Sequence, residues 1–487
     1  MADWIKKNQY WLSVFLGIAL ALAEFLFNPF ALKADATKAV AVAILMISWW
    51  ITEALPMPAV ALLPLVLHPL LQLSTIEDAS KSYSNPVIFL FMGGFMIGLA
   101  IQKWDLHKRI ALHIVKRTGT SGDRIILGFI IATGFLSMWL SNTATTMMMF
   151  PIALSVIVVM KEHEKPGPGL MNFSLVLMLV IAYASNIGGM ATIIGTPPNV
   201  AFIGFIEKKY GYTVQFLDWM MICTPLALIL LAALYVVLTK WMFPNHIKSS
   251  SEANTFINKE IKALGKLSVA EKRVLIIFII TALLWITKDL INGLKLFRLD
   301  DNMIAIMGAL ALFATPSGTR KENKPVMVLD WHDTSKMAWG ILLLFGGGIA
   351  MAASLEKAGV MSQIGNWLAG FSHSGGFTLV LLIVVISIFL SELMSNVAQV
   401  IVLAPVLAAL ADALQLDPLL LGLPMTLAAS AAAMMPMGTP PNAIVFSSGL
   451  VRLKDMLKAG FVMNIISIIV ITLFSWFLLP LVMKVLN

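Results

Sequence analysis

The stretch Ser141-Asn142-Thr143-Ala144 interrupts one long apolar run, 124–160, and Ser395-Asn396-Val397-Ala398 interrupts another, 376–414. Each arm of these runs is at or below the length, about 20 residues, that a helix needs to cross a bilayer. Polar groups at membrane depth must be satisfied by the protein itself. We therefore predict two re-entrant hairpins, each entering and leaving on one side of the membrane.

The two polar clusters belong to an internal repeat. They lie 254 residues apart, and Pro151 and Pro405 keep the same offset. Further along, Gly195-Thr196-Pro197-Pro198-Asn199 recurs as Gly438-Thr439-Pro440-Pro441-Asn442 at an offset of 243. Ordered matches of this kind indicate a duplicated unit. An odd number of expected crossings separates the halves, so they have opposite orientations, as is typical of secondary transporters.

The composition predicts an all-α polytopic membrane protein. Hydrophobic residues make up 59% of the 487 positions and charged residues only 12%, which argues against a soluble enzyme. We expect 11 transmembrane helices besides the hairpins. They are the apolar runs 10–30, 37–51, 57–73, 86–101, 172–205, 218–239, 274–293, 302–315, 339–355, 416–450 and 459–483.

The net charge of +8 follows from membrane topology. With the N-terminus in the cytoplasm, the expected inner loops hold 24 of the 34 Lys and Arg residues. Such a bias is the usual sign of orientation. It predicts a cytoplasmic N-terminus, an extracytoplasmic C-terminus and no nucleic-acid partner. A bacterial cell (inner) membrane fits the short loops.

The repeated motifs are suited to binding cations and carboxylates. Proline breaks a helix, and the broken ends expose carbonyl oxygens and helix N-termini that can hold ions. Serines 137 and 141, and serines 391 and 395, are spaced four apart on the hairpin arms. Together with a tip asparagine and the carbonyl of Gly195 or Gly438, each pair predicts an uncharged oxygen cage, which favours a monovalent cation over Ca²⁺ or Mg²⁺. Local capping of the broken helices is the alternative.

The chain resembles the divalent-anion:sodium symporter family, the INDY-like di- and tricarboxylate transporters. The resemblance begins at Trp49-Trp50-Ile51-Thr52-Glu53-Ala54-Leu55-Pro56 and ends in the segment 430–445. Two Ser-Asn-Thr-type clusters combined with two Gly-Thr-Pro-Pro-Asn-type loops make it specific.

This resemblance implies a homodimer in the lipid bilayer, each subunit with a scaffold domain and a transport domain that moves as an elevator. It implies Na⁺ as the coupling ion and no other cofactor. One sodium site is implied at Ser137, Ser141, Asn142 and Gly195. A second is implied at Ser391, Met394, Asn396 and Gly438. The implied substrate-binding residues are Asn142, Thr143, Asn396, Val397, Thr196, Pro197, Thr439 and Pro440. Val397 departs from the threonine that dicarboxylate carriers often place there, which removes one hydroxyl.

The repeat and the resemblance together give a domain plan. The expected parts are N-terminal scaffold helices at 1–85, a first inverted repeat at 86–240 with its hairpin, a cytoplasmic interfacial linker at 241–271, scaffold helices at 272–338, and a second inverted repeat at 339–487. Within the linker, segment 256–264 spaces apolar residues at helical intervals. A helix in the membrane interface and a disordered loop are both open at this stage.

The function expected from these features is sodium-coupled symport of C4-dicarboxylates such as succinate, malate and fumarate. A sodium-independent dicarboxylate exchanger is the alternative, as is a citrate or sulfate carrier with the same fold. An ion channel or an intramembrane enzyme is a rival of another class. A channel would show conductance without saturable accumulation, and no His or Cys lies near either repeated motif to serve an enzyme.

Overall fold

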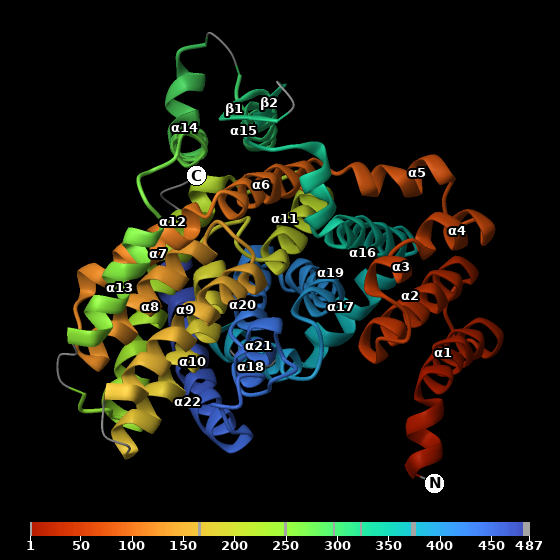
Figure 1. The fold of residues 1–487 in the computed structure, drawn as a ribbon. Helices are drawn as coiled ribbons and strands as arrows, with labels where there is room; N and C mark the ends of the chain where they lie inside the picture. Colours follow the sequence, from red (N-terminus) through yellow and green to blue (C-terminus); the bar gives the residue numbers. More distant parts are fainter. Residues whose placement is uncertain are drawn as a thin grey trace. The chain divides into compact units, whose positions relative to one another are not determined.

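The computed structural model describes residues 2–163, 167–247, 251–295, 298–321, 324–371 and 376–480. Its described residues are mostly helical (Figure 1). The chain divides into two compact units, which we treat separately. Unit 1 comprises Met1–Phe89, Val200–Val214 and Ala338–Ala429, and unit 2 comprises Leu90–Asn199, Gln215–Met337 and Ser430–Asn487. Three helices, α6 (Pro86–Lys103), α11 (Pro197–Tyr210) and α20 (Pro418–Ser430), run from one unit into the other.

Unit 1 contains the N-terminal helices and the second hairpin. Helices α1 and α2 pack against each other, and the indole of Trp49 on α2 donates to the carbonyl of Val14 on α1 (3.1 Å). The elements of this unit, α1 and α2 included, follow in chain order. They are α1 (Ala2–Phe27), α2 (Ala34–Thr52), α3 (Met57–Val60), α4 (Leu63–Leu70), α5 (Ile76–Lys81) with a 3₁₀ turn (Ser82–Ser84), α16 (Trp339–Lys357), α17 (Val360–Phe371), α18 (Gly376–Ser391) and α19 (Asn396–Leu414).

Unit 2 contains the first hairpin and both glycine-proline loops. Its elements are α7 (Leu106–Thr118), α8 (Gly122–Ser137), α9 (Asn142–His163), α10 (Pro168–Gly189), α12 (Phe216–Val236) with a π-helical end (Val237–Met242), α13 (Ser251–Ala263), α14 (Val269–Gly293), α15 (Asp301–Ala314), an antiparallel pair β1 (Pro316–Lys321) and β2 (Lys324–Met327), a 3₁₀ helix (Trp331–Lys336), α21 (Pro440–Phe446), and α22 (Leu453–Leu473) with a π-helical end (Phe474–Leu478).

The helix lengths confirm a polytopic protein. Among the described residues, ten helices are long and apolar enough to cross a membrane, and four shorter apolar helices accompany them. The run 57–73, expected as one crossing, forms the two short helices α3 and α4. Pro64, at the start of α4, explains this interruption, because it lacks a backbone donor and restrains the residue before it.

Both hairpin breaks lie where the sequence predicts them. Helices α8 and α18 end at Ser137 and Ser391, and α9 and α19 begin at Asn142 and Asn396. The first arms have 16 residues each, but α9 has 22 and α19 has 19. The expectation that every arm is at or below spanning length is therefore wrong for α9, because its helix continues to His163.

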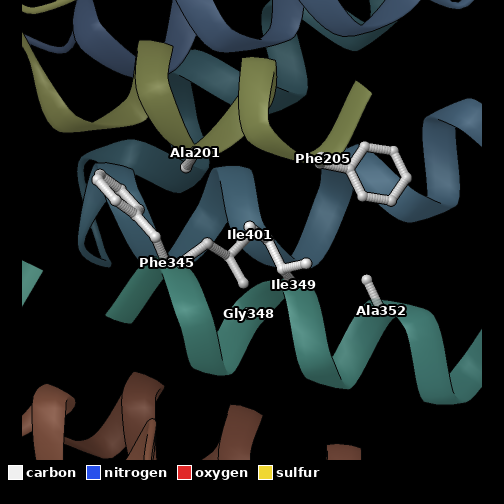
Figure 2. Close-up of a pocket in the computed structure, with 7 residues that line it drawn as sticks. All are labelled: Ala201, Phe205, Phe345, Gly348, Ile349, Ala352 and Ile401. Atoms are coloured by element: carbon white, nitrogen blue, oxygen red, sulfur yellow. The ribbon is translucent and has the colours of Figure 1, made fainter. Parts of the chain in front are cut away.

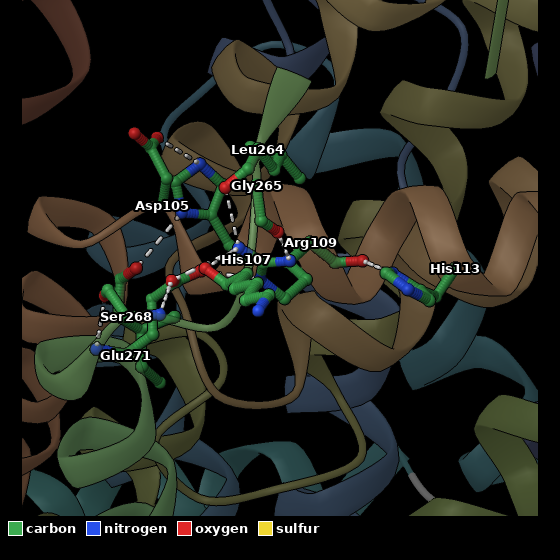
Figure 3. Close-up of polar contacts among 10 residues, drawn as sticks. Asp105, His107, Arg109, His113, Leu264, Gly265, Ser268 and Glu271 are labelled. Carbon is green, nitrogen blue, oxygen red and sulfur yellow. Dashed lines mark hydrogen bonds and ion pairs between the residues drawn. The ribbon is translucent and has the colours of Figure 1, made fainter. Parts of the chain in front are cut away.

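The linker forms a helix, α13, that is anchored in unit 2. Arg109 on α7 donates to both carboxylate oxygens of Glu271 (2.7 and 3.2 Å) and to the carbonyls of Leu264 (3.0 Å) and Gly265 (3.1 Å), as Figure 3 shows. Glu271 also accepts from the backbone N–H of Ser268, completing the cap of α14. The Arg109 guanidinium thus donates hydrogen bonds both to backbone carbonyls just after α13 and to the carboxylate in the first turn of α14.

Replacing Arg109 by glutamine is expected to lower the stability of the protein strongly. Glu271 is only 5% exposed, and removing one partner of a buried ion pair costs about 3–5 kcal/mol because the other charge stays buried. Lys108→Gln is the matched control, since Lys108 pairs with Glu260 (3.1 Å) at more exposed positions. Melting temperatures of the purified variants test this. An equal loss in both variants would contradict a special role for Arg109.

Candidate binding site

The first hairpin tip brings two predicted residues into contact. The hydroxyl of Ser137, at the end of α8, lies within hydrogen-bond distance of the side-chain amide of Asn142, at the start of α9 (2.8 Å). Ser137 is fully buried. The hydroxyl of Ser141 instead accepts from the backbone N–H of Ala144 (3.3 Å). Ser141 therefore caps α9 locally, and no hydrogen bond joins it to Ser137 or Asn142 among the contacts of the described residues.

The loop 190–196 is tied to this tip from several sides. Helix α10 ends at Gly189, and two of the carbonyls that follow accept from α12: Met190 from the indole of Trp219 (3.0 Å) and Ala191 from the hydroxyl of Thr224 (3.2 Å). The hydroxyl of Thr192 donates to the carbonyl of Met138 at the tip. The helix ends at the break are therefore held by side chains of their neighbours, as buried helix ends require.

Oxygen atoms converge on one end of the Asn142 amide. The terminal amide atom at that end lies 2.8 Å from Ser137 Oγ, 3.0 Å from the Ser185 carbonyl oxygen and 3.3 Å from the Gly195 carbonyl oxygen. With the amide nitrogen at that end, it can donate to these oxygens; with the amide oxygen there, the two carbonyl oxygens repel it unless a cation lies among them. This uncharged oxygen cluster suits a monovalent hard cation.

The other predicted residues of the first half lie around this cluster. Thr196 Oγ1 is 3.5 Å from the Asn142 amide nitrogen and is almost fully buried. Thr143 lies half-buried in the first turn of α9, and Pro197 opens α11. The structure thus brings Ser137, Asn142, Gly195 and Thr196 together.

The second hairpin, in unit 1, repeats the same contact. Ser391 donates to the amide oxygen of Asn396 (2.6 Å) and approaches the carbonyl of Ala429 (2.5 Å). Met394 and Val397 are half-buried beside them. Gly438, Thr439 and Pro440 belong to unit 2, so the two parts of the predicted second sodium set are described separately.

The second glycine-proline loop, in unit 2, repeats one hydrogen bond of the first. The amide nitrogen of Asn199 donates to the carbonyl of Thr192 (2.8 Å), and that of Asn442 donates to the carbonyl of Met435 (3.0 Å). These two bonds occupy equivalent positions of the repeat. Thr439 caps α21, its hydroxyl accepting from the N–H of Asn442 (3.4 Å).

Sequence reasoning missed Ser185 and Asn186 on α10. Ser185 contributes a carbonyl to the oxygen cluster, and Asn186 lies 3.4 Å from the Asn142 amide nitrogen. The signal was present, because this Ser-Asn pair is polar within a 22-residue apolar helix. Unlike the hairpin clusters, this pair does not recur in the second half. The sequence alone therefore does not separate it from polar residues that only pack within a helix bundle.

A small pocket in unit 1 is a different kind of feature. Figure 2 shows its lining by Ala201 and Phe205 of α11, Phe345, Gly348, Ile349 and Ala352 of α16, and Ile401 of α19. All of these side chains are apolar. A carboxylate needs polar groups to orient it, so we do not place the substrate there.

Comparisons with known proteins agree with this architecture. The family model described as the sodium:sulfate symporter transmembrane region matches residues 7–484. A sodium-dependent dicarboxylate transporter, SdcS, of Staphylococcus saprophyticus is 38% identical over 468 residues, which cover 95% of this chain and 90% of the relative. SdcS of Staphylococcus aureus strain USA300 is 37% identical over 492 residues, covering 99% and 94%.

A solved structure shares the fold. The crystal structure of the Alcanivorax borkumensis YdaH transporter, reported as having an unusual topology, matches with a TM-score of 0.53 at 12% identity, covering 82% of this chain and 86% of that one. The many apolar helices, together with a family model and relatives named as transporters, identify a multi-pass membrane transporter and not an enzyme. The chain belongs to the divalent-anion:sodium symporter family, which confirms the resemblance seen in the sequence.

Proposed function

We propose that the protein is a sodium-coupled symporter of C4-dicarboxylates such as succinate, malate and fumarate. The observation that carries this proposal is the convergence of the Ser137 hydroxyl and the Ser185 and Gly195 carbonyls on the Asn142 amide. The relatives named as sodium-dependent dicarboxylate transporters support it. The cluster has no formal charge, so a bound cation leaves a positive site that favours an anion nearby, and the anion favours the cation in return.

The proposed sites follow the repeat. One sodium ion is held by the first-half set Ser137, Ser141, Asn142 and Gly195, with the Ser185 carbonyl added. A second is held by Ser391, Met394, Asn396 and Gly438. The substrate carboxylates meet the hairpin tips and the loops through Asn142, Thr143, Thr196, Pro197, Asn396, Val397, Thr439 and Pro440.

The proposed mechanism is an elevator in a homodimer of the inner membrane, with the N-terminus in the cytoplasm and the C-terminus outside. Segments 1–85 and 272–338 form the scaffold, and the transport domain is drawn from the two repeats, 86–240 and 339–487. The linker 241–271 lies at the cytoplasmic interface. In such a mechanism the binding site crosses the membrane with its domain, alternating access as other inverted-repeat carriers do.

Uptake of labelled succinate into proteoliposomes tests the function. We expect accumulation with an inward sodium gradient and loss of accumulation when potassium replaces sodium. Gradient-independent uptake that requires internal dicarboxylate would overturn symport in favour of the exchanger. If citrate or sulfate inhibits succinate uptake more strongly than malate does, the substrate is a tricarboxylate or an inorganic anion and not a C4-dicarboxylate.

A further inference from the structure

Three polar residues of unit 2 form a chain of contacts between the first hairpin and the second loop. The amide nitrogen of Asn142 lies 3.4 Å from the amide oxygen of Asn186, a long hydrogen bond. The amide nitrogen of Asn186 donates to the hydroxyl oxygen of Thr439 (3.0 Å). Asn186 and Thr439 are each 3% exposed. Asn186 thus joins the oxygen cluster to a residue proposed to meet the substrate.

The hydrogen-bond capacity of Thr439 fixes what its hydroxyl can do. A hydroxyl has one donor hydrogen and two acceptor lone pairs. Its oxygen accepts from Asn186 and also from the backbone N–H of Asn442 (3.4 Å). With both lone pairs engaged, the hydroxyl is left as a donor. A donor suits a carboxylate oxygen, whereas an acceptor would repel it.

The Asn142 amide can take either of two orientations, which differ by half a turn and give it different partners. In one, its oxygen faces the cluster and its nitrogen faces Asn186. Rotated by half a turn, its nitrogen donates to Ser137 Oγ, the Ser185 carbonyl and the Gly195 carbonyl, at 2.8, 3.0 and 3.3 Å. A cation in the cluster requires the first orientation, because only an oxygen can ligate it. Without a cation the rotated orientation is preferred, since it removes the repulsion between oxygens.

We propose that Asn186 is a positioning residue that relays sodium binding to the substrate hydrogen bond of Thr439. With sodium bound, Asn142 donates to Asn186, Asn186 donates to Thr439, and Thr439 donates to the substrate carboxylate. Without sodium, the rotated Asn142 presents its oxygen to Asn186. Asn186 then rotates as well and presents its own oxygen to Thr439, whose hydroxyl donates to Asn186 and is withdrawn from the substrate.

This relay rests on the proposed function and explains how one part of it works. It makes the order of hydrogen-bond donors, and not charge alone, a source of coupling between cation and anion. It also makes the two halves of the repeat unequal. The offset of 243 that pairs Gly195 with Gly438 pairs Asn186 with Ala429, which has no polar side chain. Only the first half carries the relay.

The test is the sodium dependence of succinate binding to the purified full-length protein. Asn186→Leu keeps the branching at Cγ and removes both hydrogen bonds. We expect the ratio of succinate affinities at high and low sodium to fall about tenfold, the effect of losing one buried hydrogen bond to a charged ligand. Sodium raises the melting temperature of a protein that binds it. The sodium concentration that gives half of this rise, measured without succinate, should stay within about twofold of the wild-type value. Asn172→Leu is the control, because Asn172 lies on the same helix and bonds only to the carbonyl of Pro244 (2.9 Å) among its described contacts.

A double-mutant cycle with Thr439→Val distinguishes a relay from two separate effects. Thr439→Val removes the hydroxyl at nearly constant shape, and we expect a similar loss of coupling. The relay predicts that adding Asn186→Leu then changes the coupling ratio no further. If the reductions of the coupling ratio in the two single variants multiply in the double variant, the relay is overturned. A wild-type coupling ratio in either single variant would also overturn it. Both results would leave symport intact. If Asn186→Leu does not fold, unchanged coupling in Thr439→Val overturns it alone. Sodium-independent succinate binding by the wild type would overturn both proposals.

Discussion

Asn142→Ala is expected to abolish sodium-dependent uptake while leaving the protein folded. The Asn142 amide is the centre of the oxygen cluster, within hydrogen-bond reach of Ser137, Asn186 and Thr196. Its removal takes away one cation ligand and the group that positions the others, so we expect transport to fall by about a hundredfold or more, equivalent to roughly 3 kcal/mol. Asn142 is only half-buried, so the melting temperature should change little.

The measurement is uptake of labelled succinate in proteoliposomes with a sodium gradient, normalised to reconstituted protein. Asn396→Ala should give a comparable loss, since Asn396 makes the equivalent contact with Ser391. Asn172→Ala, on α10 and outside the cluster, is the control for the loss of an asparagine side chain. Uptake by Asn142→Ala within about threefold of wild type would refute the site.

The breaks in the helices could be predicted because their signals are local. Prolines and the Ser-Asn pairs act on their own and neighbouring backbone, and each break repeats in both halves. The breaks before Asn142 and Asn396 and those before Pro197 and Pro440 are all present. Arm lengths were less predictable, since α9 extends beyond the apolar run through Lys161 and Glu162, where nothing in the pattern forces it to end.

The remaining features depend on partners that are distant in the sequence. The sequence of the linker is compatible with a helix and with a disordered loop, because its amphipathic pattern is short. The contacts that hold it come from Arg109, more than 150 residues earlier in the chain. Asn186 bonds to a residue 253 positions away. One polar side chain in an apolar helix is compatible with many partners, so the sequence alone does not single it out.

Gly189→Ala is expected to remove transport while preserving the fold, and Gly188→Ala to damage the fold itself. A Cβ atom at Gly189 would lie 2.3 Å from the Asn142 amide oxygen and 3.1 Å from its nitrogen. These atoms are the end of a side chain, which can rotate away, so helix α10 can stay in place. The displaced amide would then leave the oxygen cluster. We expect the loss of uptake to match that of Asn142→Ala, because both variants remove the same group.

The neighbouring glycine meets backbone instead. A Cβ atom at Gly188 would lie 2.3 Å from the carbonyl oxygen and 2.7 Å from the Cα of Gly134 on α8. Helices α8 and α10 would have to separate, and overpacking of this kind costs about 1–3 kcal/mol or more. Gly293→Ala, whose Cβ would meet nothing within 4 Å, is the control for both. Melting temperature and uptake together test the contrast: a strongly destabilised Gly189→Ala, or a stable and active Gly188→Ala, would show that the amide and the helix crossing are not arranged as described.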